Sequence, residues 1–296
     1  MAFMILTATE QDASLTVRDF LKKHHVSARQ VQKLTRSKGI LLNGRPAFLK
    51  TTLRSGDIVK IRQTAPQESN IQPENIPVEV LYEDDHVIVL NKPPYCLVHP
   101  AGRTTSGTLS NALAYYLQQS GQKIIFHPIH RLDRDTSGCV IFAKSAEVQR
   151  ELEKQRDIHT LSRTYQALVR GTADKPSGTI QLAIGAHPTL ANRRAIREDG
   201  DRAVTHYRTI ETYDNASLLE LTLETGRTHQ IRLHLSAIGL PILGDNMYGT
   251  RSALIKRQSL HAVQTSFIHP KTGERITIKA PLTEDIANAI SMLKQK

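Results

Sequence analysis

The sequence predicts an α+β protein with two parts, a small α/β domain over residues 1–63 and a larger domain over residues 78–296. A short basic segment with two helical patterns comes first, and a polar stretch with three prolines separates it from the rest. In the larger part, strand-like runs follow one another with only a few helical patterns between them. Strands that neighbour strands favour a mixed, largely antiparallel sheet over a doubly wound parallel one.

The composition is that of a globular protein. The chain has 296 residues, of which 39% are hydrophobic and 23% are charged, and this is enough to bury a core without disulfides. Its two cysteines, Cys96 and Cys139, suit a reducing compartment. The first ten residues lack the basic start and apolar run of a signal peptide, and no stretch has the length and hydrophobicity of a membrane span. We therefore expect a cytoplasmic protein.

The positive charge is concentrated near the N-terminus. The chain has 39 Lys and Arg against 28 Asp and Glu, a net charge of +11. Residues 1–63 hold 12 of these basic residues and 4 of the acidic ones, so they carry +8 and the rest of the chain only +3. A basic balance predicts attraction to a polyanion, most often a nucleic acid. The N-terminal domain is the expected anchor for such a partner.

Two helices are predicted in this domain. Apolar residues recur at helical spacing over residues 15–24, and a second helix begins at Ser27, whose hydroxyl can cap it. Three basic side chains of the second helix form a cationic stripe: Arg29, Lys33 and Arg36. Such a stripe can be an ordinary solvated helix face, but the local net charge favours contact with a nucleic acid.

Turn signals complete the first domain. Asn43-Gly44 favours a tight hairpin after an apolar run, and residues 53–61 contain a Gly turn followed by a short strand. The order of basic helix, hairpin and final strand resembles the S4-type RNA-binding domain over roughly residues 14–62. This resemblance implies that the cationic stripe docks on an RNA backbone.

The rest of the chain divides into a linker and a larger domain. Residues 64–77 are polar and contain three prolines, which is typical of a linker. Apolar runs at 78–82 and 86–90 predict a hairpin. Helical patterns follow near 108–119, 146–157 and 228–238. Strand-like runs follow near 138–143, 164–169, 203–212, 218–224, 260–268 and 275–279.

The densest polar cluster covers residues 127–138, just before an apolar strand. An ion-paired loop is one interpretation. A metal site is another, with four possible ligands: His127, His130, Asp133 and Asp135. The metal interpretation is disfavoured because Arg131 and Arg134 place positive charge where the cation would bind.

A second polar cluster covers residues 224–234, where a strand passes through a Gly turn into a helix. Amides at a helix start favour anions, and Arg227 and Arg232 add fixed positive charge. We expect that an arginine of this cluster could reach a carboxylate of the first cluster.

Together these segments resemble the RluA family of RNA pseudouridine synthases. The motifs are LYEDDHVIVLNKP at 81–93, HRLDRDTSG at 130–138, LETGRTHQIRLHL at 223–235 and PILGDNMYG at 241–249. The resemblance covers about residues 78–282 and implies a fold with a mixed central sheet and a catalytic cleft. One departure is Tyr95-Cys96, where the family commonly has a glycine, so the shape of that loop is expected to differ.

The resemblance implies that uridine in structured RNA is isomerised to pseudouridine without a metal or organic cofactor. It makes Asp133 the catalytic carboxylate, which attacks either the uracil ring or the ribose, and Arg232 the partner of Asp133. Tyr165 corresponds to the family's active-site tyrosine; without the resemblance it would be interpreted as a core residue of a strand. The substrate-binding residues that the resemblance implies are Arg131, His130, Lys92 and Arg227.

The expected substrate is ribosomal RNA, with transfer RNA as the alternative, and the target nucleotide must leave its stack to reach a carboxylate. A non-catalytic RNA-binding or ribosome-assembly factor with the same fold is a second hypothesis. A metal-dependent hydrolase that uses the first cluster is a third. Nothing in the sequence demands more than a monomer.

Overall fold

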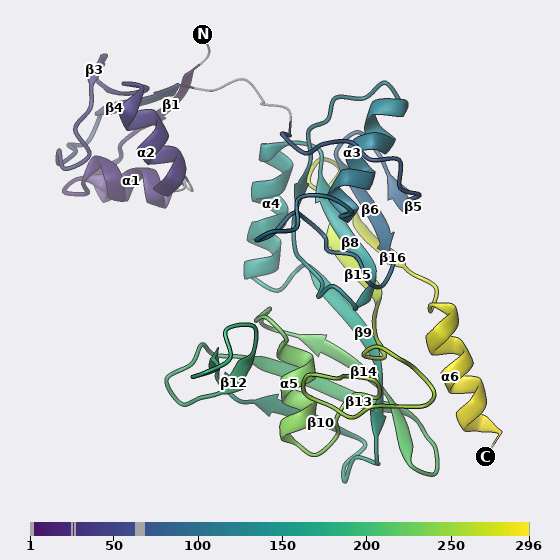
Figure 1. Cartoon of the computed structure of the whole chain (residues 1–296). Helices are drawn as coiled ribbons and strands as arrows, with labels where there is room; N and C mark the ends of the chain where they lie inside the picture. The colour runs from purple at the N-terminus through teal and green to yellow at the C-terminus, as the bar shows by residue number, and fades with distance from the viewer. Residues whose placement is uncertain (1–2, 25, 27, 63–68, 296) are drawn as a thin grey trace. The chain divides into compact units, whose positions relative to one another are not determined.

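The computed structural model describes residues 3–24, 26, 28–62 and 69–295. The chain forms two compact units, Met1–Gln67 and Glu68–Lys296, each with its own elements (Figure 1). In the described part of the chain, no helix has the length and apolar character needed to cross a membrane.

The N-terminal unit packs two helices on a small antiparallel sheet. Its elements are β1 (Phe3–Thr7), η1 (Glu10–Asp12), α1 (Val17–Lys23), α2 (Ala28–Arg36), β2 (Ile40–Leu42), β3 (Arg45–Pro46) and β4 (Ile58–Arg62), with sheet order β1-β4-β2-β3. Phe20 of α1 and Leu34 of α2 are buried in its core. Asn43 and Gly44 both have positive φ, as a two-residue hairpin turn requires. Strand β1 is not among the predicted elements, and the predicted cap Ser27 lies outside the described residues.

The larger unit contains a sheet of ten strands with the central order β10-β13-β14-β9-β15-β8-β6-β5. The elements run β5 (Glu79–Glu83), β6 (Val87–Lys92), α3 (Leu109–Gln119), β7 (His127–Pro128), β8 (Ser137–Ala143), α4 (Ala146–Asp157), β9 (Ser162–Arg170), β10 (Ser177–Gln181), β11 (Ile184–Ala186), β12 (Arg194–Ile196), β13 (Val204–Thr212), β14 (Ala216–Leu223), α5 (Gln230–Ala237), β15 (Leu260–Ile268), β16 (Arg275–Lys279) and α6 (Glu284–Lys294). Strands β8 and β15 pair parallel, whereas their other described pairings are antiparallel. The predicted α+β class with a mixed, largely antiparallel sheet is confirmed.

Helices cover both faces of this sheet (Figure 1). Alternate residues of β6 enter different cores: Ile88 and Leu90 pack with α3 and α5, whereas Val87 and Val89 pack with α4. Burial on both faces explains why β6 and β8 read as continuous apolar runs rather than alternating ones. Helix α6 packs its apolar side on a separate cluster with residues of β9 and β14.

The described part of the segment expected to be a linker belongs to the larger unit. Ser69 N donates to Ile124 O at 2.8 Å, and Glu74 N donates to Asn111 O at 3.1 Å. Strand β10, the β11–β12 hairpin and α6 are also absent from the predicted elements. Of these, α6 carried a usable signal, because its apolar residues recur at helical spacing.

Candidate active site

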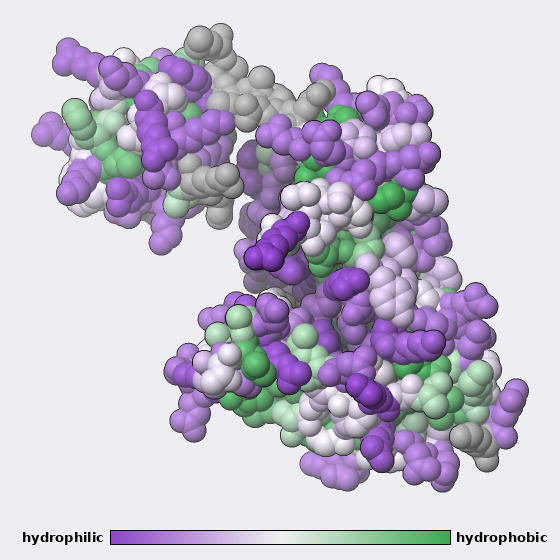
Figure 2. All heavy atoms as spheres, viewed as in Figure 1, coloured by the Kyte–Doolittle hydropathy of each residue, from purple (hydrophilic) through white to green (hydrophobic). Residues whose placement is uncertain are grey.

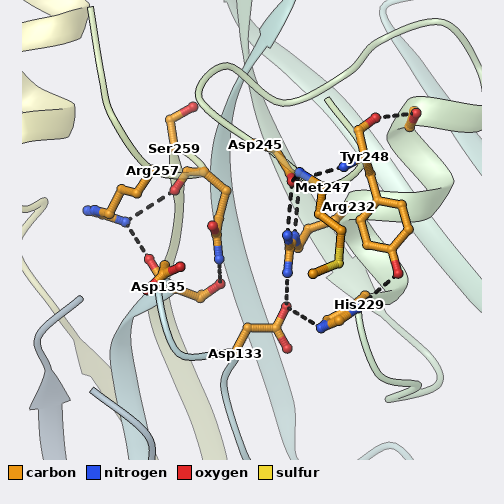
Figure 3. A network of polar contacts seen from close by, with 12 residues as sticks. Asp133, Asp135, His229, Arg232, Asp245, Met247, Tyr248, Arg257 and Ser259 are labelled. Atoms are coloured by element: carbon orange, nitrogen blue, oxygen red, sulfur yellow. Dashed lines mark hydrogen bonds and ion pairs between the residues drawn. The ribbon is translucent and has the colours of Figure 1, made fainter. Parts of the chain in front are cut away.

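The two polar clusters of the sequence meet at one pocket of the larger unit. The turn that follows β7, the start of β9 and the residues that lead into α5 form its walls. Its lining includes Arg131, Asp133, Thr136, Arg163, Tyr165, Arg227, His229, Arg232 and Leu260. Figure 3 shows the Asp133 carboxylate directed at Arg232 and His229.

Asp133 begins a tight turn whose successive carbonyl groups are all held. Its own carbonyl accepts from Thr136 N at 3.1 Å. The next one, Arg134 O, accepts from Lys92 Nζ at 2.9 Å and from Cys96 N at 3.1 Å. The third, Asp135 O, accepts from Arg257 Nη1 at 2.9 Å. These bonds fix the backbone that aims the Asp133 side chain, as a preorganised catalytic group requires.

The strand after this turn needs a glycine. A Cβ on Gly138 would lie 2.3 Å from Ala262 O, and Gly138 has a φ of +111°. The parallel pairing of β8 with β15 brings these two backbones together. Gly138 thus allows the close approach that places the Asp133 turn beside β15.

Arg232 joins two aspartates. Its Nη1 donates to Asp133 Oδ2 at 3.0 Å, and its Nε and Nη2 donate to Asp245 at 2.7 and 2.9 Å. Burial by itself disfavours the guanidinium, but the two carboxylates hold the pKa of Arg232 above its usual value. Burial likewise acts to raise the pKa of Asp245, but its bonds from Arg232 lower it. The two carboxyl groups and the guanidinium thus form one cluster, in which Asp245 is buried and Asp133 lies at the pocket.

Asp245 is completely buried, and the backbone amides of Met247 and Tyr248 also donate to it, at 2.9 and 3.1 Å. These bonds fix Asp245, which in turn orients Arg232 from the side away from the pocket. A Cβ on the preceding Gly244 would lie 2.1 Å from Arg257 O, so this segment packs tightly on its neighbour. Asp245 was quoted in a sequence motif, but its role as the second partner of Arg232 was missed.

Tyr165 forms part of the pocket wall from strand β9, opposite Leu221 of β14. Its side chain is buried, and burial together with the nearby Asp133 carboxylate raises the pKa of its phenol. The phenol is therefore protonated at neutral pH. Arg163, two residues earlier on the same strand, lines the pocket as well and was missed by the sequence analysis.

Both predicted substrate-binding arginines reach the pocket, and both are exposed. Arg131 and Arg227 are among its lining residues. Arg227 Nε donates to Arg202 O at 3.2 Å, and its Nη1 lies 3.7 Å from Asp201 Oδ2. Exposed guanidinium groups at the edge of a pocket suit contacts with phosphate.

The other two predicted substrate-binding residues lie outside the pocket lining. His130 is buried, its Nε2 accepts from Ile141 N at 3.4 Å, and burial lowers its pKa well below the usual value. Lys92 is completely buried, and its Nζ donates to Pro93 O, Cys96 O and Arg134 O at 2.7–2.9 Å. Both side chains therefore contact the backbone around the Asp133 turn and are not among the residues that line the pocket.

The buried ammonium of Lys92 predicts a loss of activity at high pH. Burial lowers the pKa of Lys92 to about 8. The ammonium has three donors for three carbonyls, whereas the neutral amine has two, so deprotonation releases a carbonyl of the loop that holds Asp133. We expect the single-turnover rate to fall as the pH rises above about 8. A Lys92→Met variant should be roughly tenfold slower at neutral pH and lack this decline, so a decline that persists in the variant would contradict the explanation.

The loop that holds Lys92 contains the departure from the family pattern. Tyr95 has a φ of +64°, and its side chain is 56% exposed. The backbone thus takes the left-handed conformation that a glycine adopts most easily, at a cost of order 1 kcal/mol for tyrosine. A glycine could therefore adopt the same backbone conformation at this position. Tyr95 differs from it by adding an exposed aromatic ring.

The four residues considered as metal ligands do not form a metal site. Within residues 3–24, 26, 28–62 and 69–295, no group of three or more His, Cys, Asp or Glu side chains is arranged to hold a metal ion. Asp133 instead bonds to Arg232, and His130 points into the core.

The residues of the cationic stripe lie on α2 of the N-terminal unit. Lys33 and Arg36 are in its last turn. Arg29 is in the same helix, but its side chain lies outside the described residues. Positive side chains near a helix C-terminus also interact favourably with the helix dipole.

Comparisons with known proteins identify the family of this chain. A family model described as RNA pseudouridylate synthase matches residues 86–237, a range that includes Asp133, Tyr165 and Arg232. A protein named uncharacterized RNA pseudouridine synthase YjbO, from Bacillus subtilis, is 36% identical over 278 residues, 93% of this chain and 98% of the relative. Ribosomal large subunit pseudouridine synthase D of Xanthomonas campestris is 38% identical over 283 residues, 91% of this chain and 85% of the relative.

Solved structures show the same fold. The human protein RNA Pseudouridylate Synthase Domain Containing 4 superposes with a TM-score of 0.60 at 21% identity, covering 73% of this chain and 93% of that one. The human RNA Pseudouridylate Synthase Domain Containing 1 gives 0.59 at 23% identity, covering 78% and 98%. These two likenesses concern the fold alone.

Proposed function

The chain belongs to the RluA family of RNA pseudouridine synthases, and from this we propose that it modifies ribosomal RNA with Asp133 as its catalytic carboxylate. The observation that carries the proposal is the Asp133–Arg232 contact of 3.0 Å at the pocket. A carboxylate that must act as a nucleophile has to be ionised and held in one orientation. Arg232 places a fixed positive charge beside the Asp133 carboxylate and holds it in one orientation, because the guanidinium is itself fixed by Asp245.

The reaction breaks the N1–C1′ bond of uridine and forms a C5–C1′ bond, so C5 loses a proton and N1 gains one. Asp133 would attack either the uracil ring or C1′. The target uridine must first leave its stack, at a cost of a few kcal/mol that is smallest in loops and bulges. Arg131 and Arg227 would hold phosphates beside the vacated position.

Tyr165 would pack against the uracil ring of the flipped nucleotide. Its raised pKa means that the free protein holds a neutral phenol. Removal of the C5 proton by Tyr165 therefore requires that the phenol first release its own proton, whereas packing against the ring does not. A Tyr165→Phe variant separates these two roles, because it keeps the ring and lacks the hydroxyl.

The names of the relatives favour ribosomal RNA. Proteins named ribosomal large subunit pseudouridine synthase D from Xanthomonas campestris and Nitrosomonas europaea are 38% and 37% identical to this chain. We propose that the protein acts as a monomer. We place the reaction in the cytoplasm, in keeping with two cysteines that are free thiols.

Tritium release tests the proposed substrate. Because C5 loses its hydrogen, RNA made with [5-³H]uridine should release tritium to water in proportion to the pseudouridine formed. We expect release from transcripts of large-subunit ribosomal RNA. Release from transfer RNA transcripts alone would replace the proposed substrate, and release from neither would contradict the proposal.

We also propose that the N-terminal unit is an S4-type RNA-binding domain that anchors the substrate. Its support is the +8 charge of residues 1–63, the basic last turn of α2 and the two-helix arrangement on a small sheet. Hydrophilic side chains dominate the face of this unit in Figure 2. Phosphate contacts of this kind position an RNA and do not read its sequence.

The salt dependence of RNA binding tests this anchor. A Lys33→Gln/Arg36→Gln double variant should bind ribosomal RNA more weakly, and the slope of log Kd against log salt should decrease by roughly 1.5, because two phosphate contacts are lost. The rate in a saturated complex should not change. Arg18→Gln/Lys22→Gln on α1 is the matched control, with the same loss of charge on another helix. An equal effect of both double variants would show a diffuse charge effect and contradict docking through α2.

A further inference from the structure

A chain of hydrogen bonds connects the β11–β12 hairpin to the catalytic pocket. The Arg194 backbone amide of β12 donates to the Tyr248 hydroxyl at 2.7 Å. The same hydroxyl lies 3.0 Å from His229 Nδ1, and His229 Nε2 lies 3.9 Å from Asp133 Oδ2. Figure 3 shows His229 between Tyr248 and Asp133.

This series of hydrogen bonds determines where the protons of Tyr248 and His229 lie. An amide can only donate, so the Tyr248 oxygen accepts from Arg194. Its single hydroxyl proton is then free to be donated to His229 Nδ1, and in this arrangement Nδ1 is the acceptor. A neutral histidine that accepts at Nδ1 carries its own proton on Nε2. The Nε2–H of His229 is thus the group that faces Asp133.

The charges around His229 are compatible with a neutral ring. Burial lowers its pKa, and so do Arg232 of α5 and Arg194 of β12, against the opposite effect of Asp133 and Asp245. A second proton on Nδ1 would also compete with the Tyr248 hydroxyl for the same position. The neutral Nε2–H form gives the Tyr248 hydroxyl an acceptor and places an N–H group on the side of Asp133.

Both donors that face Asp133 lie near the same oxygen. Arg232 Nη1 donates to Oδ2, and His229 Nε2 is near Oδ2 as well. Asp133 Oδ1 has no hydrogen-bond partner in the part of the chain that the structure describes. The two carboxylate oxygens are therefore unequal before any substrate arrives.

We propose that His229 is a positioning residue for the reaction: its Nε2–H, fixed by Tyr248 and the hairpin amide, holds Asp133 Oδ2 so that Oδ1 is the attacking oxygen. The inference rests on the proposed catalytic role of Asp133. The separation of 3.9 Å is long for a hydrogen bond, and contacts of this kind commonly shorten when substrate fills the site. Because the fixing amide belongs to the β11–β12 hairpin, the tautomer depends on where that hairpin lies.

The backbone of His229 supports this assignment. Its φ of +60° places it in the left-handed region, in the segment that leads directly into α5. Strain of this kind in a non-glycine residue collects at functional sites. Here it turns the imidazole toward both Tyr248 and Asp133, whose contacts come from segments far apart in the sequence.

The tautomer can be measured directly on the full-length protein. Long-range ¹H–¹⁵N spectra of ¹⁵N-histidine-labelled protein should show His229 protonated on Nε2, with a His229→Gln spectrum for assignment. A Tyr248→Phe variant should populate the Nδ1–H form, because the phenyl ring cannot donate to Nδ1. Observation of the Nδ1–H form in the unchanged protein would overturn the proposal.

Kinetics provide the second readout, on the same RNA. Tyr248→Phe should lower the single-turnover rate roughly tenfold with an unchanged Kd for RNA. His229→Gln keeps an N–H donor near the Nε2 position and should stay within about threefold, whereas His229→Leu should lose 10- to 100-fold. Equal losses for Gln and Leu, or losses only in Kd, would show a structural role and contradict the proposal. If the unchanged protein released no tritium, the proposed function itself would fail, while the tautomer result would still stand.

Discussion

An Asp133→Asn variant is expected to bind ribosomal RNA as the unchanged protein does and to form pseudouridine at least about 10⁴-fold more slowly. The amide has nearly the size of the carboxylate, but it lacks the negative charge that makes Asp133 a nucleophile. Arg232 keeps its two bonds to Asp245, so this ion pair and the fold should be unchanged. Tritium release under single-turnover conditions measures the rate, and filter binding measures the affinity.

Asp135→Asn is the matched control. Asp135 is also half-buried and belongs to the same turn, but no described contact joins its side chain to Arg232. Its variant should keep most of the activity. If Asp133→Asn retained activity within tenfold of the unchanged protein, the assignment of the catalytic carboxylate would be wrong.

Replacement of Arg232 is expected to cost both stability and activity. In Arg232→Met the completely buried Asp245 loses its only cationic partner among the described residues. Breaking a buried ion pair in this way typically lowers the free energy of unfolding by about 3–5 kcal/mol. The same variant leaves Asp133 without the guanidinium that orients it, so we expect the rate to fall by at least about 10²-fold. Chemical denaturation and single-turnover kinetics measure the two effects.

A double variant separates these two effects. Arg232→Met/Asp245→Asn removes the unpaired charge, and the asparagine can still accept from Met247 N and Tyr248 N. We expect it to recover at least about 2 kcal/mol of unfolding free energy relative to Arg232→Met alone, without recovery of the rate. Recovery of the rate together with stability would mean that Arg232 acts only through the fold.

The local patterns of the chain predict much of the fold. Strands β6 and β8 read as strands because both faces are buried, and the helical spacing near residues 146–157 and 108–119 corresponds to α4 and α3. The β11–β12 hairpin gives no such signal, since its two strands have three residues each and stand apart from the large sheet. The sequence of α6 has apolar residues at helical spacing, so this helix could have been predicted.

In the candidate site, too, the sequence predicts some residues and not others. Asp133 and Arg232 stand out as charged residues in short polar clusters, and the structure brings them to 3.0 Å. The contacts that hold them do not stand out, because Lys92 and Arg257 act on backbone carbonyl groups that every residue possesses. Nor can spacing show that Tyr248 receives an amide from a hairpin more than fifty residues earlier in the chain. Such partners follow from tertiary packing, which a motif does not encode.

Complementation in cells tests the central claim most directly. Pseudouridines are mapped across all RNAs in cells that lack the gene and in the same cells supplied with the unchanged protein or with Asp133→Asn at equal abundance. We expect sites in large-subunit ribosomal RNA to disappear with the gene, to return with the unchanged protein and to stay absent with Asp133→Asn. Return of those sites with Asp133→Asn, or no loss of any site when the gene is removed, would contradict the account.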